Sequence, residues 1–193
     1  RLNLIQEKTN TLPKNTKFKN ACINSKEIKK NDIFFAIKGK KNNGNKFLKE
    51  VFKKKSSLAI VNKVNKTFDL SKQIKVDNTI KFLTECANIY RDNLDSKIIS
   101  ITGSCGKTSL KDMMGFVLSK NYQTTYSKKS FNNKYGVPVS LFNINKKDKF
   151  GIFEIGMDKK GEINNLSKII KPNIGVITNI SYAHSKNFKN LFG

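Results

Sequence analysis

Residues 102–109, T-G-S-C-G-K-T-S, bring together two glycines, a lysine and several hydroxyl side chains between an apolar run and an amphipathic segment. Gly103 and Gly106 allow the backbone to turn so that successive N–H groups can face one anion. A helix that begins just after the loop adds unpaired N–H groups and the positive end of its dipole. The pattern therefore predicts a phosphate site, whose binding residues are Gly103, Ser104, Cys105, Gly106, Lys107, Thr108 and Ser109.

Two residues at the end of this loop carry the expected nucleotide chemistry. Lys107 can reach the β- and γ-phosphate oxygens, and the Thr108 hydroxyl can ligate a magnesium ion. The stringent pattern G-x-x-x-x-G-K-[ST] is not met, because Ile101 stands five positions before Gly106. The alternative is an ordinary strand–turn–helix connection. That alternative does not explain why a lysine lies in a first helical turn, where the helix dipole disfavours a cation.

Two further candidate residues follow apolar runs later in the chain. Glu154 ends such a run, and a carboxylate among apolar residues favours a cation nearby, although a partly exposed edge-strand glutamate is the alternative. His184 is the only histidine and follows the last apolar run, where a lone histidine is often just a surface residue. Doubly wound sheets bind ligands at the carboxyl ends of their strands, which is where the loop, Glu154 and His184 are all expected. We therefore expect the loop with Lys107 and Thr108, the Glu154 carboxylate and His184 to meet at one edge of the sheet, with Thr108 and Glu154 placed to hold a magnesium ion.

The elements of the second half must position these residues. Apolar strands are predicted at 97–101, 150–156 and 173–180, and a helix at 161–170 is ended by Pro172. The helix after the glycine loop is expected to bury one face, formed by Leu110, Met113, Met114, Val117 and Leu118. Buried strands that alternate with amphipathic helices predict a parallel sheet covered on both faces.

The first half predicts a smaller α/β unit. Strands are expected at 32–39, 57–63 and 73–77, with helices at 45–54 and from a cap at Asn78 to about Asp92. The polar stretch 91–96 marks the predicted boundary between domain 1–95 and domain 96–193. The predicted fold class is α/β, with a small mixed N-terminal domain followed by a P-loop-type parallel-sheet ATP-binding domain.

The net charge of +24 comes almost entirely from lysine, since Arg1 and Arg91 are the only arginines. The lysines are spread over the whole length beside many Asn, Ile and Phe residues, which share A/T-rich codons, so a skewed codon composition explains them. Nucleic-acid binders usually gather their charge on one face and use arginine forks. Nucleic-acid binding is kept as a remote alternative, which predicts a log–log salt slope of about −0.9 per neutralised phosphate.

The cysteines and the apolar runs indicate the cellular compartment in which the protein is expected. Cys22, Cys86 and Cys105 are far apart and odd in number, with neither metal-ligand nor disulfide spacing. No stretch approaches the roughly 18 apolar residues of a membrane span, and no signal peptide opens the chain. We therefore expect a cytoplasmic protein. Because the chain begins with Arg1 instead of methionine, a fragment or a processed chain is expected.

Four segments together resemble the Mur ligase family, the ATP-dependent amide ligases of peptidoglycan precursor synthesis. They are T-G-S-C-G-K-T-S (102–109), F-N-N-K-Y-G-V-P-V-S-L (131–141), E-I-G-M-D-K-K-G-E-I (154–163) and T-N-I-S-Y-A-H (178–184). The resemblance implies that the full enzyme uses ATP and Mg²⁺ to add D-alanyl-D-alanine to UDP-N-acetylmuramoyl-tripeptide through an acyl phosphate. It implies Lys107, Glu154 and His184 as catalytic residues and Thr108, Glu154 and His184 as metal ligands. It also places Asn132 and Asn133 by the γ-phosphate and the muramoyl substrate. Cys105 stands where the family usually has asparagine or serine.

The N-terminal half is similar to the opening of the family's uridine-nucleotide domain, with departures. The acidic–serine–arginine triplet of the family is Asn24-Ser25-Lys26 here, and its aspartate–glycine–histidine triplet is Asn43-Gly44-Asn45. The resemblance implies Ser25, Lys26 and Asn43 as substrate-binding residues, without the arginine fork. It also implies that the rest of the central domain and a C-terminal domain are absent, so this fragment alone is expected to be inactive.

The resemblance further implies a monomer with small-molecule substrates and no nucleic-acid or membrane partner. A sister ligase, or a ligase similar to the folylpolyglutamate synthetases, would share the loop and accept another substrate. Assays of the complete protein with different amino substrates separate these alternatives.

Overall fold

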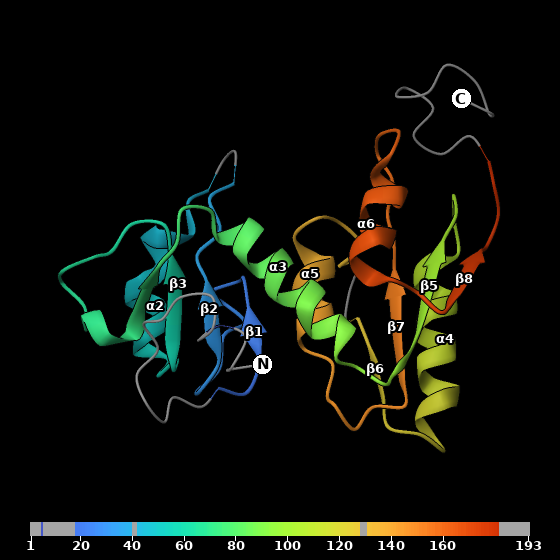
Figure 1. Ribbon diagram of the computed structural model, residues 1–193, viewed down its shortest axis with the longest axis horizontal. Coiled ribbons are helices and arrows are strands. Elements are labelled where there is room, and N and C mark those ends of the chain that lie inside the picture. Colours follow the sequence, from blue (N-terminus) through green and yellow to red (C-terminus); the bar gives the residue numbers. More distant parts are fainter. Residues whose placement is uncertain (1–4, 6–17, 40–41, 128–130, 182–193) are drawn as a thin grey trace. The chain divides into compact units, whose positions relative to one another are not determined.

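The computed structural model describes residue 5 and residues 18–39, 42–127 and 131–181 (Figure 1). The chain forms two compact units, Arg1–Tyr90 and Arg91–Gly193. This division falls inside a helix, a few residues before the predicted boundary at 95/96. The functional assignment of the two domains stays a prediction.

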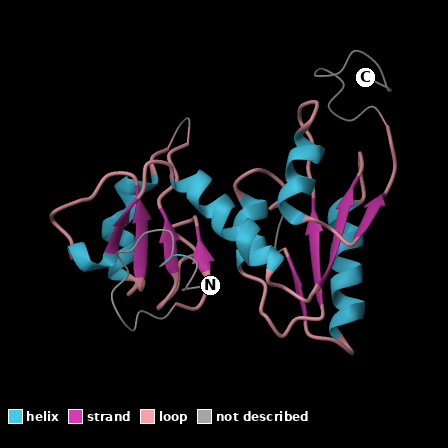
Figure 2. Ribbon diagram, in the orientation of Figure 1, coloured by secondary structure: helices cyan, strands magenta, loops and turns pink. Residues whose placement is uncertain are grey.

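The first unit is built on a parallel sheet with the strand order β1-β2-β3-β4 (Figure 2). Its elements are β1 (Ala21–Cys22), β2 (Ile33–Phe35), the 3-10 helix η1 (Gly44–Phe47), α2 (Leu48–Lys53), β3 (Leu58–Val61), the 3-10 helix η2 (Leu70–Lys72), β4 (Gln73–Lys75) and α3 (Thr79–Asp92). The predicted strands and helices are present, although the helix expected at 45–54 begins as a 3-10 turn. The Asn78 cap is confirmed, because its side-chain oxygen accepts from the Lys81 N–H at 3.1 Å.

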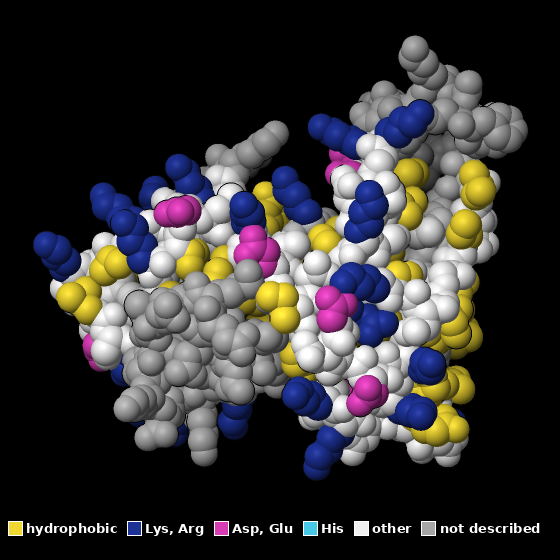
Figure 3. Space-filling view, viewed as in Figure 1, with side chains coloured by type: hydrophobic (Ala, Val, Ile, Leu, Met, Phe, Trp, Pro, Cys, Tyr) yellow, Lys and Arg dark blue, Asp and Glu magenta, His cyan; other side chains and the backbone are white. Residues whose placement is uncertain are grey.

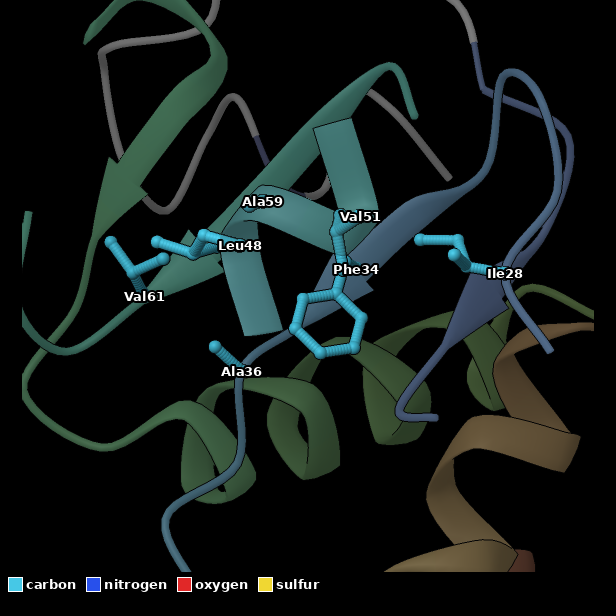
Figure 4. Close-up of a cluster of buried hydrophobic side chains, with 7 residues drawn as sticks. All are labelled: Ile28, Phe34, Ala36, Leu48, Val51, Ala59 and Val61. Atoms are coloured by element: carbon cyan, nitrogen blue, oxygen red, sulfur yellow. The ribbon is translucent and has the colours of Figure 1, made fainter. Parts of the chain in front are cut away.

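The core of the first unit lies between α2 and its sheet. Figure 4 shows Leu48 and Val51 of α2 close to Phe34, Ala59 and Val61, all of which are buried. Such burial of aliphatic and aromatic side chains is the main source of stability for a small α/β unit.

The second unit contains a parallel sheet with the order β6-β7-β5-β8. Its elements are β5 (Lys97–Thr102), α4 (Lys107–Ser119), β6 (Thr124–Tyr126), α5 (Gly136–Phe142), β7 (Phe150–Glu154), α6 (Glu162–Ile170) and β8 (Ile174–Ile177). Helix α4 covers one face of this sheet, and α5 and α6 cover the other (Figure 1). The predicted three-layer α/β fold with a parallel sheet is confirmed.

The register of β5 and β7 determines which side chains face α4. Ile99 pairs with Ile152, and two residues further along Ile101 pairs with Glu154. Side chains alternate between the faces of a strand, so Glu154 lies on the same face as Ile152. Ile99, Ile101 and Ile152 pack against α4, and the carboxylate at the end of β7 therefore points toward that helix.

The buried face of α4 differs from the predicted one. Leu110, Met114 and Leu118 pack against the sheet, whereas Met113 and Val117 are 63% and 54% exposed. A Cβ atom on Gly115 would lie 2.6 Å from the ring of Tyr126. The ring therefore packs directly on the helix backbone, which rotates the helix so that Gly115 faces β6.

Strand β8 is present where a strand was predicted, but it is not buried. It is the edge strand of the described sheet, and Ile174 and Ile177 are 52% and 63% exposed. Within the described residues, β8 therefore does not show the burial that its apolar sequence predicts.

The Arg91 side chain caps the C-terminal end of α6, just before β8. Its guanidinium donates to the backbone oxygens of Ile170 and Lys171, both at 2.8 Å, and to the Asn173 side chain at 3.1 Å. Burial lowers the pKa of Arg91, and the charge of Asp92 opposes this shift. The guanidinium fork therefore satisfies the carbonyl groups at the end of α6 that helix geometry leaves unpaired.

Replacing Arg91 with alanine should lower the free energy of unfolding of the complete protein by about 3 kcal/mol, because the backbone carbonyl groups of Ile170 and Lys171 lose their donor and the buried guanidinium is removed. Arg91→Lys should recover little of this, since an ammonium cannot reproduce the fork. Denaturant unfolding measures the effect, and Lys168→Ala, which removes an exposed cation of α6, is the control. Equal midpoints for Arg91→Ala and the control would contradict this role.

The lysine excess is spread over the surface. Figure 3 shows Lys and Arg side chains distributed over the visible faces of both units instead of gathered over one element. Among the described residues, no helix is both long and apolar enough to cross a membrane.

Candidate active site

The glycine loop connects the tip of β5 to the first turn of α4, as predicted. Gly103 and Gly106 have φ angles of +133° and +77°, in the region that favours glycine. Gly106 is the N-cap, and its carbonyl accepts the first helical bond, from the Leu110 N–H at 2.9 Å. The N–H groups of residues 106–109 therefore lie in the first turn of α4, where no carbonyl of a preceding turn can accept a hydrogen bond from them. This turn can bind an anion.

Glu154 and Thr108 meet beside this turn. The Thr108 hydroxyl donates to Glu154 Oε2 at 2.6 Å, and Asn132 Nδ2 donates to Glu154 Oε1 at 2.7 Å. Glu154 is only 2% exposed. Both carboxylate oxygens are thus hydrogen-bonded, which offsets the cost of burial and fixes the carboxylate against the helix N-terminus.

Asn132 and Asn133 have different surroundings. The Gly156 N–H donates to the Asn132 backbone oxygen at 2.7 Å, and a Cβ on Gly156 would lie 2.8 Å from the Asn132 side chain. The glycine thus makes room for Asn132 beside Glu154. The Asn133 side-chain oxygen instead accepts from the N–H groups of Tyr135 and Gly136, both at 3.0 Å, at the start of α5.

The side chain of Lys107 folds back over the glycine loop. Its Nζ donates to the backbone oxygen of Gly103 at 2.6 Å and to that of Ser104 at 3.3 Å. These contacts hold the ammonium group at the loop, where a bound phosphate would exchange for the two carbonyl oxygens.

The outer half of the loop contacts the start of T-N-I-S-Y-A-H (178–184), and the sequence did not predict this contact. The N–H groups of Ser104 and Cys105 donate to the backbone and side-chain oxygens of Asn179, both at 3.0 Å. Thr178 lies in the same segment, after β8. The resemblance to the Mur ligase family drew attention to this segment for His184, and not for Thr178 and Asn179. The predicted phosphate contacts of Ser104 and Cys105 stay predictions, since these two N–H groups already have partners.

The oxygen atoms of Thr108 and Glu154 suit a magnesium ion, which prefers oxygen ligands and keeps several positions for water and phosphate. No group of three or more His, Cys, Asp and Glu side chains that could hold a metal occurs in the described part of the chain. Within the described residues, the oxygen ligands available at this place are the Thr108 hydroxyl and the Glu154 carboxylate. The third predicted ligand, His184, lies outside the described residues.

The candidate residues of the N-terminal unit lie in local networks. The Ser25 hydroxyl donates to Glu50 at 2.8 Å and thereby lowers the pKa of Glu50, with a smaller contribution from Lys54. Lys54 Nζ also donates to the backbone oxygens of Ser25 and Lys26, at 2.9 and 2.8 Å. Asn43 caps η1 through the Asn45 N–H at 3.1 Å. Substrate binding by Ser25, Lys26 and Asn43 stays a prediction.

The second unit thus has the features of one structural class. A glycine loop leads from a sheet strand into a helix, and a carboxylate from the adjacent parallel strand meets the hydroxyl that follows the loop lysine. The fold and site define a P-loop-type α/β domain.

Comparison with known proteins agrees with this class. Residues 101–192 match the Mur ligase middle domain. The UDP-N-acetylmuramoyl-tripeptide–D-alanyl-D-alanine ligases of Rickettsia prowazekii and Buchnera aphidicola are 38% and 37% identical over 88% and 89% of this chain. The chain spans 37% of the length of each of these relatives.

Solved structures are similar along nearly the whole chain. A crystal structure of MurF from Acinetobacter baumannii has a TM-score of 0.83 at 29% identity and covers 99% of this chain and 43% of its own. MurF ligase from Thermotoga maritima, in complex with ADP, has a TM-score of 0.74 at 26% identity and covers 93% and 42%. The chain belongs to the Mur ligase family.

Proposed function

We propose that the complete protein is an ATP-dependent ligase that joins D-alanyl-D-alanine to UDP-N-acetylmuramoyl-tripeptide. The names of the relatives support this reaction, and the ADP complex of the Thermotoga maritima protein supports nucleotide binding. The observation that carries the proposal is the contact between Thr108 and the buried Glu154 at the N-terminus of α4. The described chain supplies only part of such an enzyme, so activity is assigned to the complete protein.

In the proposed reaction the terminal carboxylate of the tripeptide attacks the γ-phosphorus of ATP, which forms an acyl phosphate and releases ADP. The amine of D-alanyl-D-alanine then attacks the acyl carbon, and phosphate leaves as the amide forms. Both reactants of the first step are anionic, so their approach is opposed by charge repulsion. Lys107 and the N–H groups of residues 106–109 would offset this repulsion by position and charge.

Thr108 and Glu154 would hold Mg²⁺, with His184 contributing to a second ion. Bound magnesium would neutralise charge on the phosphate oxygens. The Thr108 hydroxyl and the Asn132 amide both donate to the Glu154 carboxylate, which holds the three side chains together at the proposed site. We assign Asn132 and Asn133 to the surroundings of the γ-phosphate and the muramoyl substrate.

The N-terminal unit would bind the UDP-muramoyl substrate through Ser25, Lys26 and Asn43. We further propose a monomer in the cytoplasm, without a nucleic-acid partner. The positive surface would then serve to attract anionic substrates.

Phosphate release by the complete protein tests the proposal. Release from ATP–Mg²⁺ and UDP-N-acetylmuramoyl-tripeptide should depend on D-alanyl-D-alanine and should not occur with single amino acids in its place. A preference for a single amino acid would assign the chain to another ligase of the family. Tight, salt-sensitive binding of duplex DNA without phosphate release would favour the nucleic-acid alternative instead.

A further inference from the structure

The segment Thr178–Ser181, here called the anchor segment, is hydrogen-bonded to the outer half of the glycine loop. The Asn179 side chain accepts from the Cys105 N–H at 3.0 Å and donates to the Cys105 sulfur at 3.0 Å. The Thr178 hydroxyl lies 2.6 Å from the Cys105 backbone oxygen, to which it donates. Cys105 is therefore bonded through its N–H, its carbonyl and its side chain to two consecutive residues.

Ser104 is joined to the same segment. Its N–H donates to the Asn179 backbone oxygen at 3.0 Å. Its hydroxyl lies 2.8 Å from the Ser181 N–H and 3.0 Å from the Ser181 backbone oxygen, so it can accept from the first and donate to the second. The anchor segment thus fixes both residues that separate Gly103 from Gly106.

Gly103 shows how closely the two segments approach. A Cβ atom at this position would lie 2.1 Å from the Thr178 hydroxyl oxygen and 2.9 Å from the Asn179 backbone oxygen. The loop therefore needs glycine here for two reasons, its φ of +133° and the contact with the anchor segment.

The contacts divide the loop into two functional halves. The N–H groups of residues 104 and 105 point to the anchor segment, and those of residues 106–109 belong to the open first turn of α4. Strand β8 pairs with β5 up to Ile177, directly before the anchor segment, so the anchor is itself held by the sheet. An anion at the N-terminus of α4 would then bind to N–H groups that the anchor segment helps to hold in a fixed direction.

We propose that Thr178 and Asn179 are positioning residues, which hold the glycine loop in the conformation that binds nucleotide phosphate. Neither residue needs to touch the nucleotide. This inference rests on the proposed function for the identity of the ligand, while the anchoring itself rests on the hydrogen bonds alone. Preorganised donors avoid the ordering cost that a free glycine loop would add to binding.

The test uses the complete protein with Thr178→Val, Thr178→Ser and Asn179→Ala. Thr178→Val keeps the shape and removes the hydroxyl, Thr178→Ser retains it, and Asn179→Ala removes the carboxamide. Thr124→Val and Asn164→Ala are matched controls, because both residues lie in other elements of the same unit. Calorimetry with Mg²⁺–ADP and with UDP-N-acetylmuramoyl-tripeptide gives separate affinities, and hydrogen–deuterium exchange of the peptide covering residues 103–109 reports on the loop.

Thr178→Val and Asn179→Ala should each raise the Kd for Mg²⁺–ADP about tenfold, with the affinity for the UDP substrate unchanged. Amide exchange in the loop should be faster in both variants, and Thr178→Ser should behave like the wild type. Nucleotide binding within twofold of wild type in both variants, or unchanged exchange, would overturn the positioning role. If the wild-type protein bound no nucleotide, the proposed function would be overturned. Faster amide exchange in the loop of Thr178→Val and Asn179→Ala would still support the anchoring of the loop in that case.

Discussion

Replacing Lys107 with alanine in the complete protein should lower the turnover of ATP-dependent ligation by at least about 10³-fold. The ammonium group is the one loop side chain whose charge can offset the repulsion between the substrate carboxylate and the γ-phosphate. No backbone N–H can replace a full positive charge at that place. Turnover measured as ADP release at saturating substrates gives the effect directly.

The same variant should remain folded. Lys107 Nζ contacts only the loop oxygens of Gly103 and Ser104 among the bonds described for it, and the packing of α4 depends on Leu110, Met114 and Leu118. The thermal unfolding temperature should therefore stay within a few degrees of wild type. Lys146→Ala, which removes an exposed lysine from a turn of the same unit, is the matched control and should keep normal turnover. Near-normal turnover of Lys107→Ala would remove the loop from the mechanism.

The loop and Glu154 could be predicted from the sequence because the loop follows one apolar strand and Glu154 ends another, and parallel strands bring such positions to one edge. The sequence did not show which face of the sheet the Glu154 side chain occupies, and the strand pairing supplies this information. The register Ile101 with Glu154 decides that the carboxylate faces α4, and a shift by one residue would have turned it to the opposite face. Local composition carries no information about that register.

Although T-N-I-S-Y-A-H (178–184) stood out in the sequence, the bonds between the anchor segment and the loop were not predicted. They join residues more than 70 positions apart, such as Asn179 and Cys105. The buried face of α4 was predicted only in part: Leu110, Met114 and Leu118 pack against the sheet as expected, but Met113 and Val117 are exposed because Gly115 faces Tyr126. Helix α5 was not predicted at all. Its sequence G-V-P-V-S-L-F is buried throughout and has no polar face, so it shows no helical periodicity.

Replacing Glu154 with glutamine should raise the Mg²⁺ concentration needed for half-maximal turnover roughly 100-fold or more, by analogy with the loss of other metal-site groups. Glutamine keeps an oxygen that can accept from Asn132 Nδ2, and its amide can donate to the Thr108 oxygen. The variant therefore removes the negative charge with little change of shape. A magnesium ligand that has lost its charge binds the hard cation far more weakly.

Two comparisons separate this effect from a general loss of structure. Excess Mg²⁺ should restore part of the turnover of Glu154→Gln, which damage to the fold would not allow. Asp92→Asn neutralises an exposed carboxylate paired with Lys171, and because such surface pairs contribute little, its Mg²⁺ dependence should match wild type. If Glu154→Gln showed the wild-type Mg²⁺ dependence, the carboxylate would be a structural partner of Thr108 and Asn132 alone, and the metal would have to be held elsewhere.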